Sequence, residues 1–316
     1  MEYEQLILLF KVIEYVLIFM FGIVIGSFLN VCIYRIPLGE SIATKNSHCM
    51  TCGTPIKKYD LIPLFSWLIL RGKCRACKAK ISGRYPLVEF LNGALYVLMV
   101  MRFPFETYGY KCIPLMLMIS ALIVIGFMDF DTQEISVAVL IFSGVFAIAD
   151  YILQLLGLSH GYDITLLSRI IGAAEISLVL LLVGFVITPL VYSLRDEDKK
   201  HLKELKAKLE NADENRVKEL KSEIEALEKE IKENGPVFGF GMGDVLLMIS
   251  GGFILGWKST IIAAFIGILL GAIAGMILKR RSGESKFAFG PYLSIGLVCA
   301  MFFGDSLFSW YISMMA

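Results

Sequence analysis

The stretch "VIEYVLIFMFGIVIGSFLNVCIY", residues 12–34, decides the fold of this chain. After Glu14 it runs for twenty residues without a charge, which is the length that an α-helix needs to cross the hydrocarbon core of a bilayer. The apolar run is too long for a cleavable signal peptide, and no basic region precedes it. We therefore expect a retained transmembrane helix, and the GxxxG formed by Gly22 and Gly26 predicts close packing against a second helix.

The rest of the chain has the same apolar character. Of its 316 residues 57% are hydrophobic, the mean hydropathy is +0.70 and the net charge is +1. These values exclude an ordinary soluble protein. The sequence predicts an all-α polytopic membrane protein with about eight transmembrane helices, and the seven that follow the first are expected at 86–102, 112–129, 134–156, 168–193, 243–257, 259–278 and 288–313.

Charged residues gather in three hydrophilic segments that all fall on one side of the membrane if every predicted helix crosses it once. Residues 35–85 carry ten Lys or Arg against two acids, 195–235 is almost wholly polar, and 279–286 is short and basic. The positive-inside rule makes this side cytoplasmic. A basic segment could also bind nucleic acid, but this one lacks aromatic interleaving and a recognition helix. Membrane orientation and acidic lipid headgroups explain its charge more simply, so we expect membrane lipid and no nucleic acid as a partner.

The segment 195–235 has its own helical pattern. Apolar residues recur at helical spacing before and after "NADEN" (211–215), which favours a charged hairpin of two short helices over a solvated linker. The chain then divides into a first transmembrane helix, a cytoplasmic four-cysteine domain, transmembrane helices 2–5, the hairpin and transmembrane helices 6–8, at residues 1–34, 35–85, 86–194, 195–235 and 236–316.

Two CxxC pairs lie in the first hydrophilic segment, Cys49 with Cys52 and Cys74 with Cys77, and 21 residues separate them. Two such pairs supply the four thiolates of a tetrahedral Zn²⁺ site. With all four positions filled by protein, the metal would be structural. Metal-free thiols or a redox pair remain the alternatives.

Carboxylates inside apolar segments are costly, so each is a functional candidate. Five of them fall at the cytoplasmic ends of predicted helices: Glu89, Asp129, Asp131, Glu134 and Asp244. Three lie toward the outer half, where buried, hydrogen-bonded acids are the more ordinary explanation: Asp150, Glu175 and Asp305.

Asp129 and Asp244 are far apart in the sequence but are expected at the same membrane level. Asp244 follows Gly239, Gly241 and Gly243 in "GFGMGDV", where a peptide could approach the backbone closely. An acid at a helix start can also be a simple N-cap. Two carboxyl groups that share one proton can activate water and polarise a peptide carbonyl, which is aspartic-protease chemistry. The sequence contains neither HExxH nor GxSxG.

Two other function classes compete with a protease. A transporter or proton relay would distribute its acids through the membrane depth and show an internal repeat, and we find no repeat. A scaffold built on the cysteine domain would not need an intact acid pair.

Several motifs together resemble the type IV prepilin peptidases, the bifunctional leader peptidase/N-methyltransferase family of bacterial pilus and type II secretion systems. They are "GSFLNVCIYRIP" (26–37), the CxxC pairs, "RYPLVEFLNG" (84–93), "DFD" (129–131), "GFGMGDV" (239–245) and "FGPYLSIG" (289–296). Three features depart from the family pattern, namely Leu246 in place of a lysine, "EIS" (134–136) in place of Ile-Pro or Leu-Pro, and a long 195–235 segment.

The resemblance implies a multi-pass protein of the bacterial inner membrane that removes the basic leader of a prepilin or pseudopilin after a glycine, at the cytoplasmic face. It implies Asp129 and Asp244 as catalytic acids, since the related preflagellin peptidases keep only the first acid of "DFD". It further implies methylation of the new N-terminus with S-adenosylmethionine, for which the sequence shows no binding motif. Glu89 is a hypothetical partner for the new ammonium group.

Overall fold

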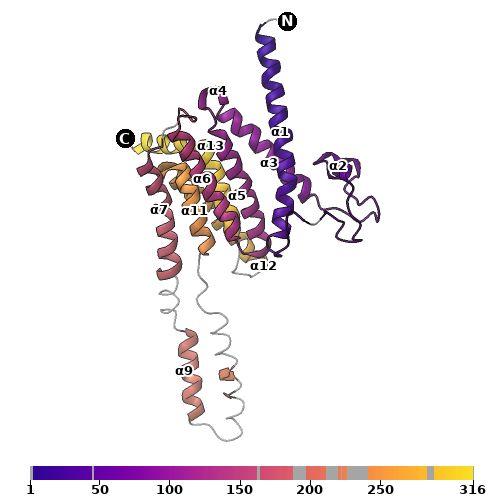
Figure 1. Ribbon diagram of the computed structural model, residues 1–316. Coiled ribbons are helices and arrows are strands. Elements are labelled where there is room, and N and C mark those ends of the chain that lie inside the picture. The colour runs from indigo at the N-terminus through magenta and orange to yellow at the C-terminus, as the bar shows by residue number, and fades with distance from the viewer. Residues whose placement is uncertain are drawn as a thin grey trace.

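The computed structural model describes residues 3–44, 46–161, 164–187, 197–210, 220–221, 223–225, 241–282 and 288–315, and these form a helical bundle (Figure 1). No β-strand occurs among them. The long helices are α1 (Tyr3–Arg35), α3 (Arg84–Arg102), α5 (Cys112–Thr132), α6 (Val137–Leu155), α7 (Leu166–Leu182), α11 (Met242–Leu255), α12 (Trp257–Ser282) and α13 (Gly290–Met315). Shorter helices are α2 (Phe65–Ile69), α4 (Phe105–Tyr108) and α9 (Glu197–Glu210).

The predicted all-α membrane fold is confirmed. Six helices are long and apolar enough to cross a membrane, namely α1, α5, α6, α7, α12 and α13. The other two predicted spans are also helices, but α11 has only 14 residues and α3, with 19, is less apolar. The count of eight crossings therefore stays a prediction that depends on these two helices.

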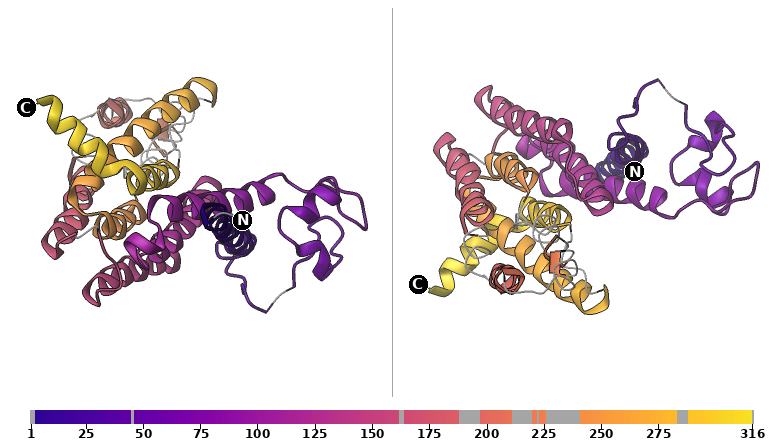
Figure 2. Two further views of the ribbon diagram at one scale, coloured as in Figure 1. Left: turned by 90° about the horizontal axis from the view of Figure 1, so that it is seen from above. Right: turned by 90° about the horizontal axis from the view of Figure 1, so that it is seen from below.

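Helix α5 lies at the centre of the bundle. It contacts α1, α3, α6 and α13, and most of its residues are buried. The other helices pack chiefly in pairs, α1 with α3, α7 with α11, and α12 with α13 (Figures 1 and 2). The segment that contains α2 lies to one side of the bundle, next to α1 and α3 (Figure 2).

Glycines allow the closest helix contacts. A Cβ added to Gly22 would lie 2.7 Å from the Cα of Gly93 on α3, and one added to Gly26 would lie 2.7 Å from the Cα of Glu89. The GxxxG of α1 is thus a packing face, as its sequence predicts. In the same way, a Cβ added to Gly172 on α7 would lie 2.6 Å from the carbonyl oxygen of Gly252 on α11.

Buried polar side chains also join the helices. Asn92 on α3 donates to the Gly22 carbonyl of α1 at 2.7 Å and accepts from Ser120 of α5 at 2.8 Å. Tyr96 completes the set with a 2.8 Å hydrogen bond to the Ser120 hydroxyl. Such bonds hold helices together where hydrophobic association is weak, because lipid is as apolar as the helix surfaces.

A buried ionic cluster lies where α6 ends and α5 and α7 begin. Arg169 of α7 is fully buried, and its guanidinium donates to Asp150 at 2.8 Å and to Gln154 at 2.6 Å. Lys111 lies 3.6 Å from the second oxygen of Asp150. Asp150 is therefore the buried, hydrogen-bonded acid that its depth predicted, and it stands apart from Asp129 and Asp244.

The first half of the predicted charged hairpin matches α9, which lies beyond the ends of α7 and α11 (Figure 1). Leu205 on α9 and Ile224, both predicted apolar positions of the hairpin, are buried. Most of the predicted second helix, after residue 210, lies outside the described residues.

Candidate active site and metal centre

The structure brings Asp129 and Asp244 to the same end of the bundle. Asp129 lies one turn before the end of α5, and Asp244 is in the first turn of α11. Both are buried, each with 6% of its surface exposed. Because both carboxyl groups are buried at this end of the bundle, ionisation of one disfavours ionisation of the other.

Asp129 is held by the start of a third helix. Its Oδ2 accepts a 2.8 Å hydrogen bond from the backbone N–H of Gly290, the first residue of α13. A Cβ on Gly290 would lie 2.8 Å from that oxygen, so only glycine allows this approach without displacement. The first amides of a helix have no partner inside it, and together with the helix dipole they favour a carboxylate at this position.

Asp244 caps its own helix with one oxygen and leaves the other free. Its Oδ2 accepts the N–H of Gly241 at 3.0 Å, which is the capping role that an acid at a helix start can have. Its Oδ1 is buried without a hydrogen-bond partner among the described residues. A buried carboxylate oxygen that is left unpaired costs free energy, so this atom is available to a ligand or a water.

Ile135 packs against Gly243 and Gly290, the glycines that lie beside Asp244 and Asp129. A Cβ added to Gly243 would lie 2.9 Å from the Cβ of Ile135, and one added to Gly290 would lie 3.2 Å from its Cδ1. The glycine before Asp244 thus allows close packing between α11 and the α5–α6 connection. Gly239, the first glycine of the motif, lies outside the described residues.

Asp131, the second acid of "DFD", points to a different partner. Its carboxylate forms an ion pair with Arg84 at the start of α3, at 2.7 Å. The Arg84 guanidinium also lies over the Phe127 ring, 4.7 Å from its centroid. Asp131 is therefore a connection between α3 and α5, while Asp129 is the member of "DFD" that is buried at the start of α13.

The remaining predicted acids are not part of this pair. Glu89 is buried and accepts the backbone N–H of Leu64 at 2.7 Å, which ties the cysteine-containing segment to α3. Its role toward a substrate ammonium group stays a hypothesis. Asp305 accepts from Ser259 at 3.0 Å, and Glu134 is exposed.

The four predicted cysteine ligands converge in space. Their sulfur atoms all lie within 4.8 Å of one another, and the distance between the sulfurs of Cys49 and Cys77 is 3.8 Å. Four thiolates about 2.3 Å from a Zn²⁺ ion lie ~3.8 Å apart, so the cluster fits a tetrahedral metal site.

Both CxxC turns have the same backbone design. The amide of Gly53 donates to the Cys49 carbonyl at 2.8 Å, and the amide of Lys78 donates to the Cys74 carbonyl at 3.0 Å. Gly53 and Lys78 both have positive φ, +69° and +61°. Each turn thereby directs two sulfurs toward one point.

Backbone amides also favour the thiolate form. Hydrogen bonds from the amides of Cys52 and Thr51 lower the pKa of the Cys49 thiol from its ordinary value of 9.0. The amides of Cys77 and Ala76 do the same for the pKa of Cys74. Thiolates are the form that binds metal, so the local structure prepares Cys49 and Cys74 for a cation.

Two residues at the acid site were missed by sequence reasoning, namely Gly290 and Ile135. Gly290 belongs to the motif "FGPYLSIG", and a Gly-Pro pair ahead of an apolar run is a helix-start signal that exposes free amides. That signal could have indicated an anion-binding helix end. Nothing in the sequence indicates that this end lies on Asp129, 161 residues away.

Comparisons with known proteins match two family models to the chain. Residues 20–103 match the bacterial peptidase A24 N-terminal domain, and residues 116–276 match the type IV leader peptidase family. The two models include the cysteine cluster, Asp129 and Asp244. The comparisons do not favour the transporter alternative.

Curated relatives agree with these matches. A prepilin leader peptidase/N-methyltransferase of Aeromonas salmonicida is 30% identical over 94% of this chain and 93% of its own length. A protein of the same name from Bacillus subtilis is 26% identical over 94% and 98%. One from Myxococcus xanthus is 44% identical, but over 37% of this chain and 34% of its own. No solved structure matches the chain.

Proposed function

The chain belongs to the type IV leader peptidase family, and we propose that it is an aspartic endopeptidase that removes the leader from type IV prepilin-like precursors. Its proposed catalytic pair is Asp129 and Asp244. The observation that supports this pair most directly is that two buried carboxyl groups, from α5 and α11, lie at one end of the bundle with Ile135 packed against a glycine beside each of them. Each of them accepts one backbone amide, from Gly290 and Gly241 respectively.

The chemistry follows from one proton shared between the two acids. The ionised carboxylate takes a proton from a water, and the water oxygen attacks the carbonyl carbon of the scissile peptide. The protonated carboxyl donates a hydrogen bond to the carbonyl oxygen as negative charge develops on it. When the C–N bond breaks, the amine leaves with a proton from the pair. Mutual repulsion and burial keep both acids from ionising together.

The proposed substrate is a prepilin or pseudopilin precursor with a short basic leader, cut after a glycine at the cytoplasmic face of the bacterial inner membrane. The names of the relatives, and that of an Escherichia coli type 4 prepilin-like leader peptide-processing enzyme, 30% identical over 89% of this chain, support this substrate class. The acid pair lies at the end of the bundle that the basic segment 35–85 makes cytoplasmic.

The names of the relatives also support a second activity, N-methylation of the new N-terminal residue. We propose S-adenosylmethionine as the methyl donor, whose sulfonium group supplies an electrophilic methyl. We assign no residue to its binding.

For the cysteine cluster we propose a structural Zn²⁺ ion held by Cys49, Cys52, Cys74 and Cys77. Four protein thiolates leave no open coordination position, so the ion would stabilise the segment rather than act on substrate. Arg75 and Asp60, joined by two hydrogen bonds at 2.7 and 2.8 Å, connect the second CxxC turn to the residues before α2.

The test is leader cleavage by the purified full chain, followed by mass spectrometry of a prepilin substrate with and without the methyl donor. Asp129→Asn and Asp244→Asn should each lower the cleavage rate by about 10²–10⁴-fold, the range for loss of a general acid or base. The double variant should lose little more than either single variant, because the two acids act as a unit.

Asp131→Asn is the matched control, two residues from Asp129. Because Asp131 is paired with Arg84 and is partly exposed, its loss should change the cleavage rate by less than about 10-fold. Cleavage that survives Asp129→Asn or Asp244→Asn would contradict the assignment. So would an Asp131→Asn variant that is as inactive as Asp129→Asn.

A further inference from the structure

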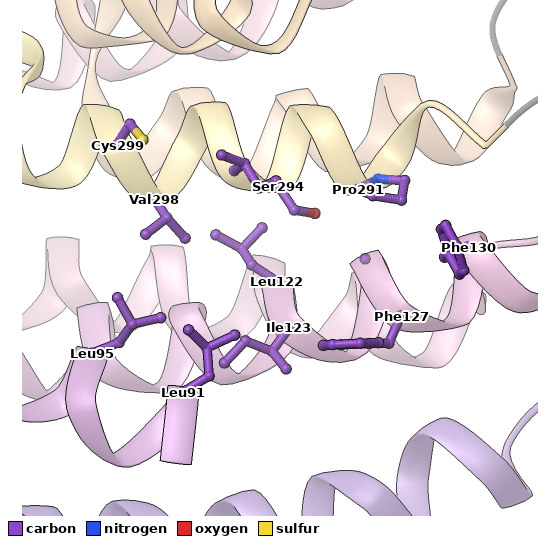
Figure 3. Close-up of a pocket in the computed structure, with 12 residues that line it drawn as sticks. Leu91, Leu95, Leu122, Ile123, Phe127, Phe130, Pro291, Ser294, Val298 and Cys299 are labelled. Carbon is purple, nitrogen blue, oxygen red and sulfur yellow. The ribbon is translucent and has the colours of Figure 1, made fainter. Parts of the chain in front are cut away.

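An apolar groove lies between α3, α5 and α13, next to the acid site (Figure 3). Its volume is about 390 Å³, and its lining is almost wholly apolar. Each of the three helices contributes side chains, among them Leu91 and Leu95 from α3, Ile123 and Phe127 from α5, and Ser294 and Val298 from α13.

One end of this groove adjoins the proposed active site. Phe130 directly follows Asp129, and Pro291 directly follows Gly290, whose amide binds Asp129; both line the groove. From Pro291 the groove follows α13 as far as Cys299, which is eight residues or ~12 Å along the helix axis. A bound segment would therefore extend from the reacting acids toward the middle of the bundle.

Among the described residues, one side-chain oxygen that lines the groove lacks a hydrogen-bond partner. Ser294 is 5% exposed, and its hydroxyl oxygen has no hydrogen-bond partner among the described residues. Figure 3 shows this oxygen pointing from α13 toward the groove and α5. A buried hydroxyl without a partner costs free energy, so its position indicates a ligand with its own polar group at this depth.

We propose that the groove binds the apolar segment of the precursor that directly follows the scissile bond. This inference rests on the proposed function and adds the position of the substrate. The basic leader does not fit an apolar groove, because its charges would be buried without partners. An apolar lining instead fits a segment on the other side of the cut, which enters the groove with the scissile bond beside Asp129.

Ser294 distinguishes such a segment from a lipid chain. The first backbone N–H groups of a helix have no partner within the helix, and lipid offers them none. The Ser294 hydroxyl, one turn beyond Gly290, accepts a hydrogen bond from one of these N–H groups. An acyl chain has no donor to offer there.

The test fills the groove and compares two substrates. Val298→Trp places a large side chain in it, and Phe303→Trp on the lipid-facing side of the same helix is the control, since Phe303 is exposed. We expect Val298→Trp to lower kcat/KM at least 10-fold for a full-length precursor. For a short peptide that ends two residues after the cleavage site, kcat/KM should stay unchanged. Phe303→Trp should leave both substrates unchanged.

A second variant tests the hydroxyl alone. Ser294→Ala should raise the KM for the full-length precursor about 5-fold, the effect of one neutral hydrogen bond, and should leave the short peptide unaffected. Ser306→Ala, at an exposed serine of the same helix, is the control. Equal losses for both substrates, or no loss for the full-length precursor, would overturn the proposal; the second result would leave lipid as the occupant.

A wrong binding site and a wrong proposed function would give different experimental results. A precursor that carries a photo-reactive residue in its apolar segment can be cross-linked to the full-length Asp129→Asn variant without any cleavage. Cross-links to α3, α5 and α13 at groove residues support the binding site, even if the wild-type protein cleaves neither substrate. Cross-links confined to other helices or to lipid contradict it, even if the wild type is active.

Discussion

At the scale of single residues, the acid site depends on where two helices begin. The Gly290 amide at the start of α13 holds Asp129, and the Gly241 amide before α11 holds Asp244. Helix N-termini stabilise negative charge, whereas burial and mutual repulsion oppose it. Together, these opposing effects favour a state in which only one of the two carboxyl groups is ionised. The unpaired Oδ1 of Asp244 is the atom best placed to receive a water.

The acid site is most sensitive to a small substitution at Gly290. In Gly290→Ala, the new Cβ would lie 2.8 Å from the Asp129 Oδ2 and would displace the carboxyl group. A shift of about 1 Å at a reacting group lowers the rate on the order of 10²-fold, so we expect a loss of that size in kcat for leader cleavage.

The matched control is Gly144→Ala on α6, where an added Cβ meets no atom within 4 Å. It should fold and cleave as the wild type does and gain slightly in stability, because alanine favours a helix over glycine. Full activity in Gly290→Ala would show that the contact with Asp129 is not needed.

Sequence reasoning identified Asp129 and Asp244 as the two acids that share a membrane level, and the structure places both at the same end of the bundle, beside Ile135. It also favoured Asp129 over Asp131, whose side chain the structure pairs with Arg84 instead. The sequence could not reveal Gly290 or the free hydroxyl of Ser294. Their significance depends on how α13 packs against α5, and that packing is a property of the whole bundle.

At the scale of elements, the cysteine segment is the part whose stability should depend on a metal. Cys49→Ser and Cys74→Ser each remove one thiolate from the four-sulfur cluster. Zinc content of the purified protein should fall from about one per chain toward zero, and protease sensitivity of residues 35–85 should rise. Unchanged zinc in both variants, measured by elemental analysis, would contradict the proposed metal site.

Low pH should release the same metal. Amide hydrogen bonds hold the pKa of Cys49 and Cys74 below the ordinary 9.0, so the thiolates persist to lower pH than free thiols do. A group with a lowered pKa in the folded state adds stability above its unfolded pKa, and that stability is lost as the pH falls through the folded pKa. Zinc should therefore be retained at neutral pH and lost on acidification, not on alkalinisation, in a pH titration of bound zinc.

The ionic cluster at the other end of the bundle should contribute to stability and not to catalysis. Asp150→Asn would leave the fully buried Arg169 and the nearby Lys111 without their carboxylate. Removing one partner of a buried ion pair costs about 3–5 kcal/mol, so the melting temperature in detergent should fall.

The fraction of the Asp150→Asn variant that stays folded should cleave at the wild-type rate, because Asp150 lies apart from the acid pair. A variant that is stable but inactive would instead give Asp150 the functional role that a proton relay requires.

Sequence patterns predicted which segments are helices better than they predicted which helices pack against each other. Each predicted span contains a helix among its described residues, since a long apolar segment in lipid must satisfy its own backbone hydrogen bonds. The pairing of α7 with α11 was not predicted. It depends on the contact between Gly172 and Gly252, and isolated glycines are too common in membrane helices to indicate their partners.

At the scale of the whole molecule, the topology decides whether the proposed chemistry takes place on the side where a newly made precursor has its leader. Six helices qualify as membrane spans, and α3 and α11 decide the total. If both cross, the chain crosses eight times and the termini lie opposite the cysteine segment. If only one of them crosses, the basic segments 35–85 and 279–286 end up on different sides, which the positive-inside rule disfavours.

This topology can be tested in intact cells with a thiol reagent that does not cross the inner membrane. Gly157→Cys places a thiol in the exposed connection between α6 and α7, and Lys57→Cys places one in the basic segment. We expect Gly157→Cys to be labelled in spheroplasts, and Lys57→Cys to be labelled only after lysis. Labelling of both variants from outside would place the acid pair on the wrong face of the membrane for a precursor whose leader lies in the cytoplasm, and the leader peptidase assignment would then lose its geometric basis.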